Sequence, residues 1–334
     1  MSRIYEALQK AETERKVDDD NVQRAPAHAT TGLEEPSLPV ERPEEKVERV
    51  QRFERLERLE RPESIPEPVL PPSAFEPEWA YDRHSGIDFD WNEIALRPWS
   101  PTLGSLPALM ERGAEVEQFR SLRSRIFELR DAGPLKSILI SSGLPQEGKS
   151  FIAANLAVSL AKHKNSKVLL IDGDMRRYTL HQTLGCESLP GLADYLAGKA
   201  TAMEVMQRAA APEGGVTQPT LPINLTFIPG GDGGDKAADL SGNPRFGELI
   251  RLAAPHFDWI IVDSSPVLPV SDAVNLARSC DGVLLVARSE VTRYPVAQKA
   301  QVELKASRIL GFVLNAVHRG PQSADYYGYE AEKE

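Results

Sequence analysis

Residues 138 to 152, ILISSGLPQEGKSFI, predict the fold of this chain. The stretch passes from an apolar run through a turn into apolar helix formers. The pattern G-x-x-x-x-G-K-[ST] is met there by Gly143, Gly148, Lys149 and Ser150. In such a loop, backbone N–H groups and the start of a helix hold phosphate groups, the lysine supplies positive charge, and the hydroxyl can ligate Mg²⁺. The stretch therefore indicates a phosphate-binding loop, and the alternative is a glycine turn that binds nothing.

The segments around this loop have the order that the motif needs. A strand is expected at 136 to 142 and a helix at 150 to 162, so the loop joins a strand to a helix. Further strands are expected at 167–171, 225–228, 259–262, 282–287 and 311–314. Further helices are expected at 115–130, 191–198, 202–209, 244–254, 272–278 and 295–306. Apolar strands separated by helices predict an α/β fold with a mainly parallel sheet covered on both faces, which binds ligands at the carboxyl ends of its strands.

Charge and composition divide the chain unevenly. The first hundred residues carry 14 Lys and Arg against 23 Asp and Glu, whereas the remainder carries 25 against 26. The nearly neutral remainder lacks the broad basic surface typical of nucleic-acid binding, so no nucleic-acid partner is expected. No run approaches the ~18 apolar residues of a membrane span. We expect a short amphipathic helix at 1–15, a disordered acidic, proline-rich linker at 16–105, a folded domain at 106–317 and a tyrosine-rich tail at 318–334.

Acidic side chains follow two of the expected strands. The segment VLLIDGDMRR, 168 to 177, places Asp172 and Asp174 at a strand end, and DWIIVDSSP, 258 to 266, places Asp263 at another. On an extended backbone the first two point the same way, and Arg176 continues that side if the extension holds. Three carboxylates beside a phosphate loop predict a Mg²⁺ site, because Mg²⁺ prefers oxygen ligands. The alternative is that these aspartates only form turns or cap helices.

The three motifs resemble those of a known family. SSGLPQEGKS, LLIDGDMRR and IIVDSSP, in this order, resemble the Walker A, A′ and B motifs of the P-loop NTPase-type bacterial tyrosine autokinases that control capsule and exopolysaccharide export. Further similarity lies in E-x-x-R-x-x-R at 117 to 123, in GLADYL and VLNAV, and in the tail DYYGYE. The opening MSRIYEALQKAE resembles the start of the stand-alone cytoplasmic members that accompany exosortase-linked systems.

The resemblance implies an ATP- and Mg²⁺-dependent protein-tyrosine kinase that phosphorylates its C-terminal tyrosines in trans. The implied catalytic residues are Lys149, Asp172, Asp174 and Arg176. Which of the two aspartates is the base stays open. The implied metal ligands are Ser150, Asp172, Asp174 and Asp263. The implied nucleotide-binding residues are Gly143, Gln146, Glu147, Gly148, Lys149, Ser150, Phe151 and Asn315. The implied phosphate acceptors are Tyr326, Tyr327 and Tyr329, and the implied ring contacts are Glu117, Arg120 and Arg123.

The resemblance also implies partners and a place in the cell. We expect a cytoplasmic protein that forms a homo-oligomeric ring and lies at the inner membrane through a chain-length-determinant or co-polymerase adaptor. A tyrosine phosphatase is expected to reverse its phosphorylation. In this setting the kinase would regulate the polymerisation and export of a polysaccharide.

Three positions depart from the family pattern. Gln146 and Phe151 stand where the family has glycine and threonine, and Tyr178 stands where proline is common. These changes are expected to affect catalytic rate more than nucleotide binding. Two other functions remain as alternatives. One is a partition- or division-type ATPase switch, which is disfavoured because Leu144 and Pro145 stand where such proteins have a lysine. The other is a non-catalytic nucleotide-binding scaffold of the export complex.

Overall fold

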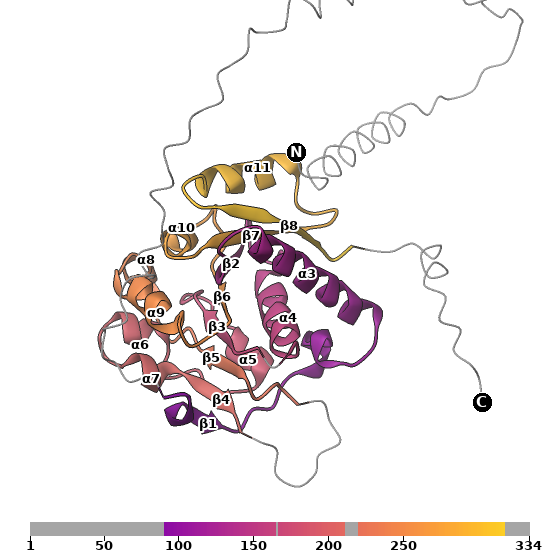
Figure 1. Ribbon diagram of the computed structural model, residues 1–334. Coiled ribbons are helices and arrows are strands. Elements are labelled where there is room, and N and C mark those ends of the chain that lie inside the picture. Colours follow the sequence, from indigo (N-terminus) through magenta and orange to yellow (C-terminus); the bar gives the residue numbers. More distant parts are fainter. Residues whose placement is uncertain (1–89, 165, 211–219, 318–334) are drawn as a thin grey trace, which may run out of the picture. The chain divides into compact units, whose positions relative to one another are not determined.

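The computed structural model describes residues 90–164, 166–210 and 220–317 (Figure 1). Within these ranges, eight strands form one sheet in the order β1-β4-β5-β3-β6-β2-β7-β8. The strands are β1 (Ala95–Arg97), β2 (Ser137–Ser142), β3 (Val168–Asp172), β4 (Gln207–Ala209), β5 (Leu225–Ile228), β6 (Trp259–Asp263), β7 (Gly282–Arg288) and β8 (Ile309–Asn315). Neighbouring strands are parallel except for β4 and β5, which are antiparallel. The predicted fold class is confirmed.

Helices cover both faces of the sheet (Figure 1). One face packs against α3 (Ala114–Asp131), α4 (Lys149–Ala161) and α5 (Leu180–Leu184). The other packs against α6 (Leu192–Leu196), α7 (Ala202–Val205), α8 (Ala237–Ser241), α9 (Arg245–Ala253) and α10 (Asp272–Ala277). Helix α11 (Tyr294–Glu303) lies near β7 and β8. The described residues also form four short 3-10 helices, namely η2 (Trp91–Glu93), η3 (Leu103–Ser105), η4 (Pro107–Leu109) and η5 (Gly234–Lys236).

Alternation along the strands explains the two covered faces. In β2, Ile138 and Ile140 belong to the apolar cluster of α3 and α4, whereas Leu139 belongs to the cluster on the opposite face. Successive side chains of a strand point to opposite faces, so a continuous apolar strand supplies both cores. None of the described helices combines the length and apolar composition that crossing a membrane would need.

The register of the central strands brings the motifs together. Strand β2, which leads into the phosphate loop, pairs with β6, and β6 pairs with β3. In the second pair Asp172 is the register partner of Asp263. Because these strands are parallel, their carboxyl ends meet at one edge, and both aspartates lie beside the phosphate loop.

The predicted linker is wrong in its last part. Residues 90 to 105 pack onto the domain: Ile94 is buried, β1 pairs with β4, and the Trp99 indole N–H donates to Gln207 Oε1 at 3.1 Å. The acidic, proline-rich composition suggested a segment with too few apolar side chains to form a core of its own. The apolar side chains of this segment instead pack against the core of the folded domain. The rest of the linker, the 1–15 helix and the 318–334 tail lie outside the described residues.

The helix predicted at 202–209 is also shorter than expected. Helix α7 ends at Val205, and Gln207–Ala209 form β4 instead. Pairing with β1 on one side and β5 on the other gives this segment two sets of hydrogen bonds. Such tertiary pairing overrides a weak helical propensity.

Side chains of α4 hold the segment that precedes α3. Asn155 accepts from the N–H of Ala108 and donates to the carbonyl of Ser105, both at 3.0 Å. Lys162, just beyond the end of α4, donates to the carbonyls of Ala108, Leu109 and Met110. The helix that begins at the phosphate loop is therefore anchored along its length.

Candidate functional site

The phosphate loop joins β2 to the first turn of α4. Gly148 has a left-handed backbone with a φ of 95°, and a Cβ at this position would lie 2.0 Å from Asn315 Nδ2. Both observations require glycine. The N–H groups of Lys149, Ser150 and Phe151 have no acceptor within α4, because the first helical hydrogen bond is the one from Ile152 to the Gly148 carbonyl. The loop therefore presents donors and the positive end of the helix dipole to an anion.

The other loop residues predicted to bind nucleotide differ in what their side chains do. Gly143 packs against α11, where a Cβ would lie 3.2 Å from Val296 Cγ1. Gln146 has a φ of 66°, a left-handed conformation in a residue that carries a side chain. Phe151 packs its ring against Phe119, with the ring centroids 5.7 Å apart. Phe151 therefore contributes a packing contact to α3 where the family has a hydroxyl.

Glu147 and Asn315 are engaged with the loop itself. The Glu147 carboxylate is buried, and it accepts from the N–H of Leu144 at 2.8 Å and from the Thr292 hydroxyl. Asn315 donates its side-chain amide to the Glu147 carbonyl at 3.0 Å. The Glu147 side chain is thus turned inward, and a role of Asn315 in binding nucleotide stays a prediction.

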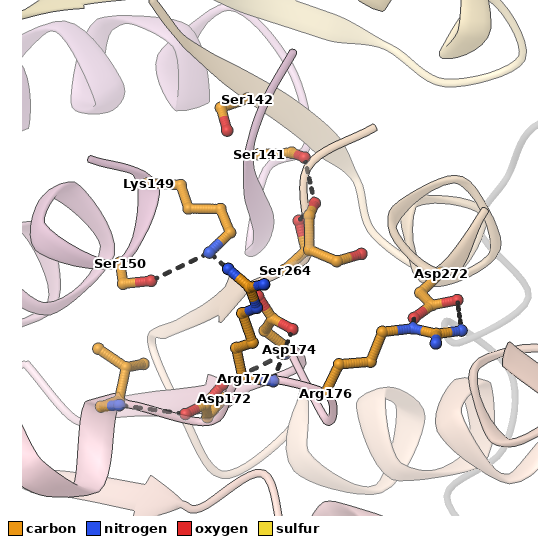
Figure 2. Close-up of polar contacts among 12 residues, drawn as sticks. Ser141, Ser142, Lys149, Ser150, Asp172, Asp174, Arg176, Arg177, Ser264 and Asp272 are labelled. Atoms are coloured by element: carbon orange, nitrogen blue, oxygen red, sulfur yellow. Dashed lines mark hydrogen bonds and ion pairs between the residues drawn. The ribbon is translucent and has the colours of Figure 1, made fainter. Parts of the chain in front are cut away.

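Lys149 stands at the centre of the acidic residues (Figure 2). Its ammonium lies 3.1 Å from Asp174 Oδ2 and 3.3 Å from Ser150 Oγ. Burial by itself lowers the pKa of Lys149, but the carboxylates of Asp263 and Asp174 outweigh it, so the pKa is raised. Lys149 is therefore a partly buried positive charge at the start of α4.

Asp172 and Asp263 are more deeply buried than their sequence motifs indicate. Asp172 accepts from the N–H groups of Asp174 and Leu180, each at 3.2 Å. Burial and the neighbouring Asp263 raise the pKa of Asp172 well above its usual range. Burial also raises the pKa of Asp263, against the effects of Lys149 and a hydrogen bond from Ser150. Both oxygens of Asp172 are thus occupied by the backbone, and the carboxylate anchors the turn after β3.

The predicted three-carboxylate metal site is not formed by the protein alone. Across the described part of the chain, no group of three or more His, Cys, Asp or Glu side chains could hold a metal ion. The physical reason is that Lys149 lies among the carboxylates and neutralises them. Asp263 Oδ1, however, is buried without a hydrogen-bond partner among the described residues. This free oxygen and the Ser150 hydroxyl fit a Mg²⁺ ion that takes its remaining ligands from phosphates and water.

Arg176 does not lie where an extended backbone would place it. The chain turns after Asp174, and the Arg176 guanidinium donates to Asp272 on α10, at 2.7 Å from Nε to Oδ2 (Figure 2). This hydrogen bond with Asp272 raises the pKa of Arg176. The alternation expected from a strand fails because β3 ends at Asp172. Asp272 gave no signal in the sequence, since an aspartate at the start of a helix is an ordinary capping residue.

The E-x-x-R-x-x-R residues lie on α3 and split into two kinds. Glu117 and Arg120 form an ion pair on the surface. Arg123 instead donates to the carbonyl of Ser159 on α4 at 2.8 Å, and burial lowers its pKa. Arg123 is therefore used within the chain, and Glu117 and Arg120 are left as the exposed candidates for a contact with another subunit.

Curated proteins similar to this chain are named tyrosine-protein kinases. The chain is 35% identical over 232 residues to tyrosine-protein kinase wzc of Salmonella typhimurium LT2, which covers 66% of this chain and 30% of that relative. It is 33% identical over 220 residues to tyrosine-protein kinase YwqD of Bacillus subtilis 168, which covers 65% of this chain and 87% of YwqD. The chain therefore spans less than a third of the first relative and most of the second.

A solved structure agrees with these relatives. The kinase domain of the Escherichia coli tyrosine kinase ETK superposes with a TM-score of 0.53 at 28% identity, and the match covers 61% of this chain and 78% of that one. The chain matches no protein-family model.

Proposed function

Because this chain belongs to the bacterial tyrosine autokinases of the capsule and exopolysaccharide family, we propose that it transfers the γ-phosphoryl group of ATP to tyrosine. The observation that carries this proposal is the position of Lys149. It is a partly buried cation at the start of a thirteen-residue helix, beside two carboxylates and a serine hydroxyl. Phosphoryl transfer depends on positioning and on neutralising charge, and this arrangement supplies both.

The chain's own residues divide the work in this proposal. The N–H groups at the start of α4 and the Lys149 ammonium hold the terminal phosphates. Ser150 and Asp263 are the residues that would hold Mg²⁺, which neutralises phosphate charge when it is bound. Asp172 keeps the turn after β3 in place through the N–H groups of Asp174 and Leu180.

Asp174 is the proposed base. A tyrosine phenol has a pKa near 10, so a carboxylate must accept its proton as the phenolic oxygen attacks the γ-phosphorus and ADP leaves. Asp172 is less suited to this role because both of its oxygens accept backbone N–H groups. The Asp174 Oδ2 atom instead faces Lys149, the residue proposed to hold the phosphates. Arg176 would need to leave Asp272 to reach the transferred group.

One experiment separates the proposed kinase from its alternatives. The purified full-length protein, incubated with Mg²⁺ and ATP, should gain phosphotyrosine on an anti-phosphotyrosine blot. Hydrolysis of ATP without phosphotyrosine would favour the ATPase switch instead. Binding of nucleotide with neither reaction would favour the non-catalytic scaffold.

The cellular setting follows as part of the same proposal. The kinase acts in the cytoplasm, peripheral to the inner membrane, through a co-polymerase adaptor, and it regulates the polymerisation and export of a polysaccharide. A tyrosine phosphatase reverses the modification. This part of the proposal is supported by membership of the family alone. The chain spans only 30% of the wzc relative but most of YwqD.

Ring assembly gives a prediction on α3. Replacement of Arg120 by alanine should shift the protein from large to smaller species in size-exclusion chromatography, because this exposed guanidinium would lose a carboxylate partner across the interface. The matched control is Arg125→Ala, since Arg125 also pairs with a glutamate three residues away on the same helix. Equal elution of the Arg120→Ala variant and the wild type as large oligomers would rule out this role.

A further inference from the structure

Glu147 connects the phosphate loop to the ends of two neighbouring strands, β7 and β8. Its backbone carbonyl accepts from the Asn315 amide at the end of β8, at 3.0 Å. Its buried carboxylate accepts from the Thr292 hydroxyl, which lies in the connection from β7 to α11. The second carboxylate oxygen accepts from the N–H of Leu144 at 2.8 Å, across the loop itself. Glu147 therefore links the shape of the loop to the ends of β7 and β8.

The direction of the Thr292 hydroxyl is set by its own connection. The N–H of Arg288 donates to Thr292 Oγ1 at 2.8 Å, and the N–H of Thr292 donates to the carbonyl of Arg288 at 2.9 Å. A hydroxyl carries one proton, so an oxygen that accepts from Arg288 is free to donate that proton to the Glu147 carboxylate. Thr292 is 9% exposed, which keeps water from replacing this bond.

Backbone strain gathers at this junction. The described residues include four non-glycine positions with positive φ, and three of them are Gln146 in the loop, Glu290 in the facing connection and Ala316 after β8. A left-handed backbone is unfavourable for a residue that carries a side chain, and it persists only where its surroundings hold it. The hydrogen bonds of Glu147, together with the Arg288 guanidinium that donates to the Gln146 carbonyl at 3.4 Å, hold Gln146 in place.

We propose that Thr292 is a positioning residue of the phosphate loop and acts through Glu147. Its hydroxyl keeps the carboxylate against the N–H of Leu144, and the loop then keeps Gln146 left-handed with its amides directed at one point. Without the hydroxyl, a buried carboxylate oxygen loses its partner and the strained loop relaxes to other conformations. The consequence is weaker binding of phosphate groups, and the inference rests on the proposed binding of nucleotide at this loop.

The test is the affinity of the full-length protein for Mg·ADP, measured by titration calorimetry. Thr292→Val keeps the shape of the side chain and removes the hydroxyl, and it should weaken binding about tenfold, as expected for a hydrogen bond to a charged group. Thr292→Ser restores the hydroxyl and should bind like the wild type. The matched control is Thr226→Val, because Thr226 is fully buried in β5 and its hydroxyl has no hydrogen-bond partner in the described part of the structure.

A second variant separates loop shape from loss of stability. Gln146→Gly provides a second background, whose own affinity for Mg·ADP is measured first, because glycine adopts a positive φ at this position without strain. In the Gln146→Gly background, Thr292→Val should weaken the binding of Mg·ADP by clearly less than tenfold. The reason is that glycine at position 146 keeps the positive φ without the hydrogen bonds of Glu147. If Thr292→Val does not fold, Thr292→Ala in both backgrounds takes its place.

The outcomes are distinct. Equal affinity of Thr292→Val and Thr226→Val, with normal binding by the wild type, would overturn the positioning role and leave the proposed function standing. An equal loss in the wild-type and Gln146→Gly backgrounds would also overturn it, because the loss would not pass through the strained loop. Absence of Mg·ADP binding by the wild type would overturn the proposed function and this inference together.

Discussion

Replacement of Lys149 by methionine should reduce the rate of tyrosine phosphorylation by about a hundredfold to a thousandfold. This is the range for removal of one charge-stabilising donor from an active site. Methionine keeps the apolar stem of the side chain but removes the ammonium that lies 3.1 Å from Asp174. Without it, the terminal phosphates would meet Asp174 and Asp263 without the Lys149 charge between them. Initial rates of labelling by ATP, read as phosphotyrosine, measure the effect.

A control on the same helix separates loss of function from loss of stability. Lys162 lies just beyond the end of α4 and donates to three backbone carbonyls, so Lys162→Met removes a partly buried ammonium away from the phosphate loop. This variant should melt at a lower temperature but retain labelling below its melting temperature. Labelling by Lys149→Met at the wild-type rate would show that the phosphates bind elsewhere.

ATP and Mg²⁺ should dissociate the proposed ring of the wild type but not that of a variant in which Tyr326, Tyr327 and Tyr329 are all phenylalanine. These tyrosines lie outside the described residues, in the tail that follows β8. Each phosphate adds ~1.5 to 2 negative charges, so three of them bring about five charges to a segment that must enter a site lined by carboxylates. Like charges oppose that binding, and the phosphorylated tail should leave the neighbouring subunit.

Light scattering before and after the addition of ATP measures this second effect. The unphosphorylated wild type and the triple variant should give the same large mass at the start, which controls for the substitutions themselves. Equal dissociation of both proteins would mean that nucleotide, and not tyrosine phosphorylation, sets the assembly state. Persistence of both rings would contradict the proposed switch as well.

Local sequence determined the elements that carry the site. The segment 138–152 showed where the strand, the loop and the helix lie, and the structure has β2 at Ser137–Ser142 and α4 at Lys149–Ala161. Apolar runs also located β3 and β6, each ending in an aspartate. This worked because a buried parallel strand needs a continuous apolar run, and because parallel strands end at one edge of the sheet. Proximity of Asp172 and Asp263 to the loop followed from those two facts.

Only the tertiary structure decided what these side chains do. Arg176 pairs with Asp272 across 96 positions, and Glu147 pairs with Thr292 across 145. Neither partner lies in a motif, so spacing along the chain could not identify it. Likewise, the sequence did not predict strand β1, because its three residues form a strand only by pairing with β4. Strand β4 also has three residues, which is too short for its sequence pattern to indicate a strand. Sequence alone determined which backbone segments surround the phosphate loop, since local apolar periodicity encodes them. The charge partners and the strained conformation of the loop depend on contacts between distant segments, which only the folded chain brings together.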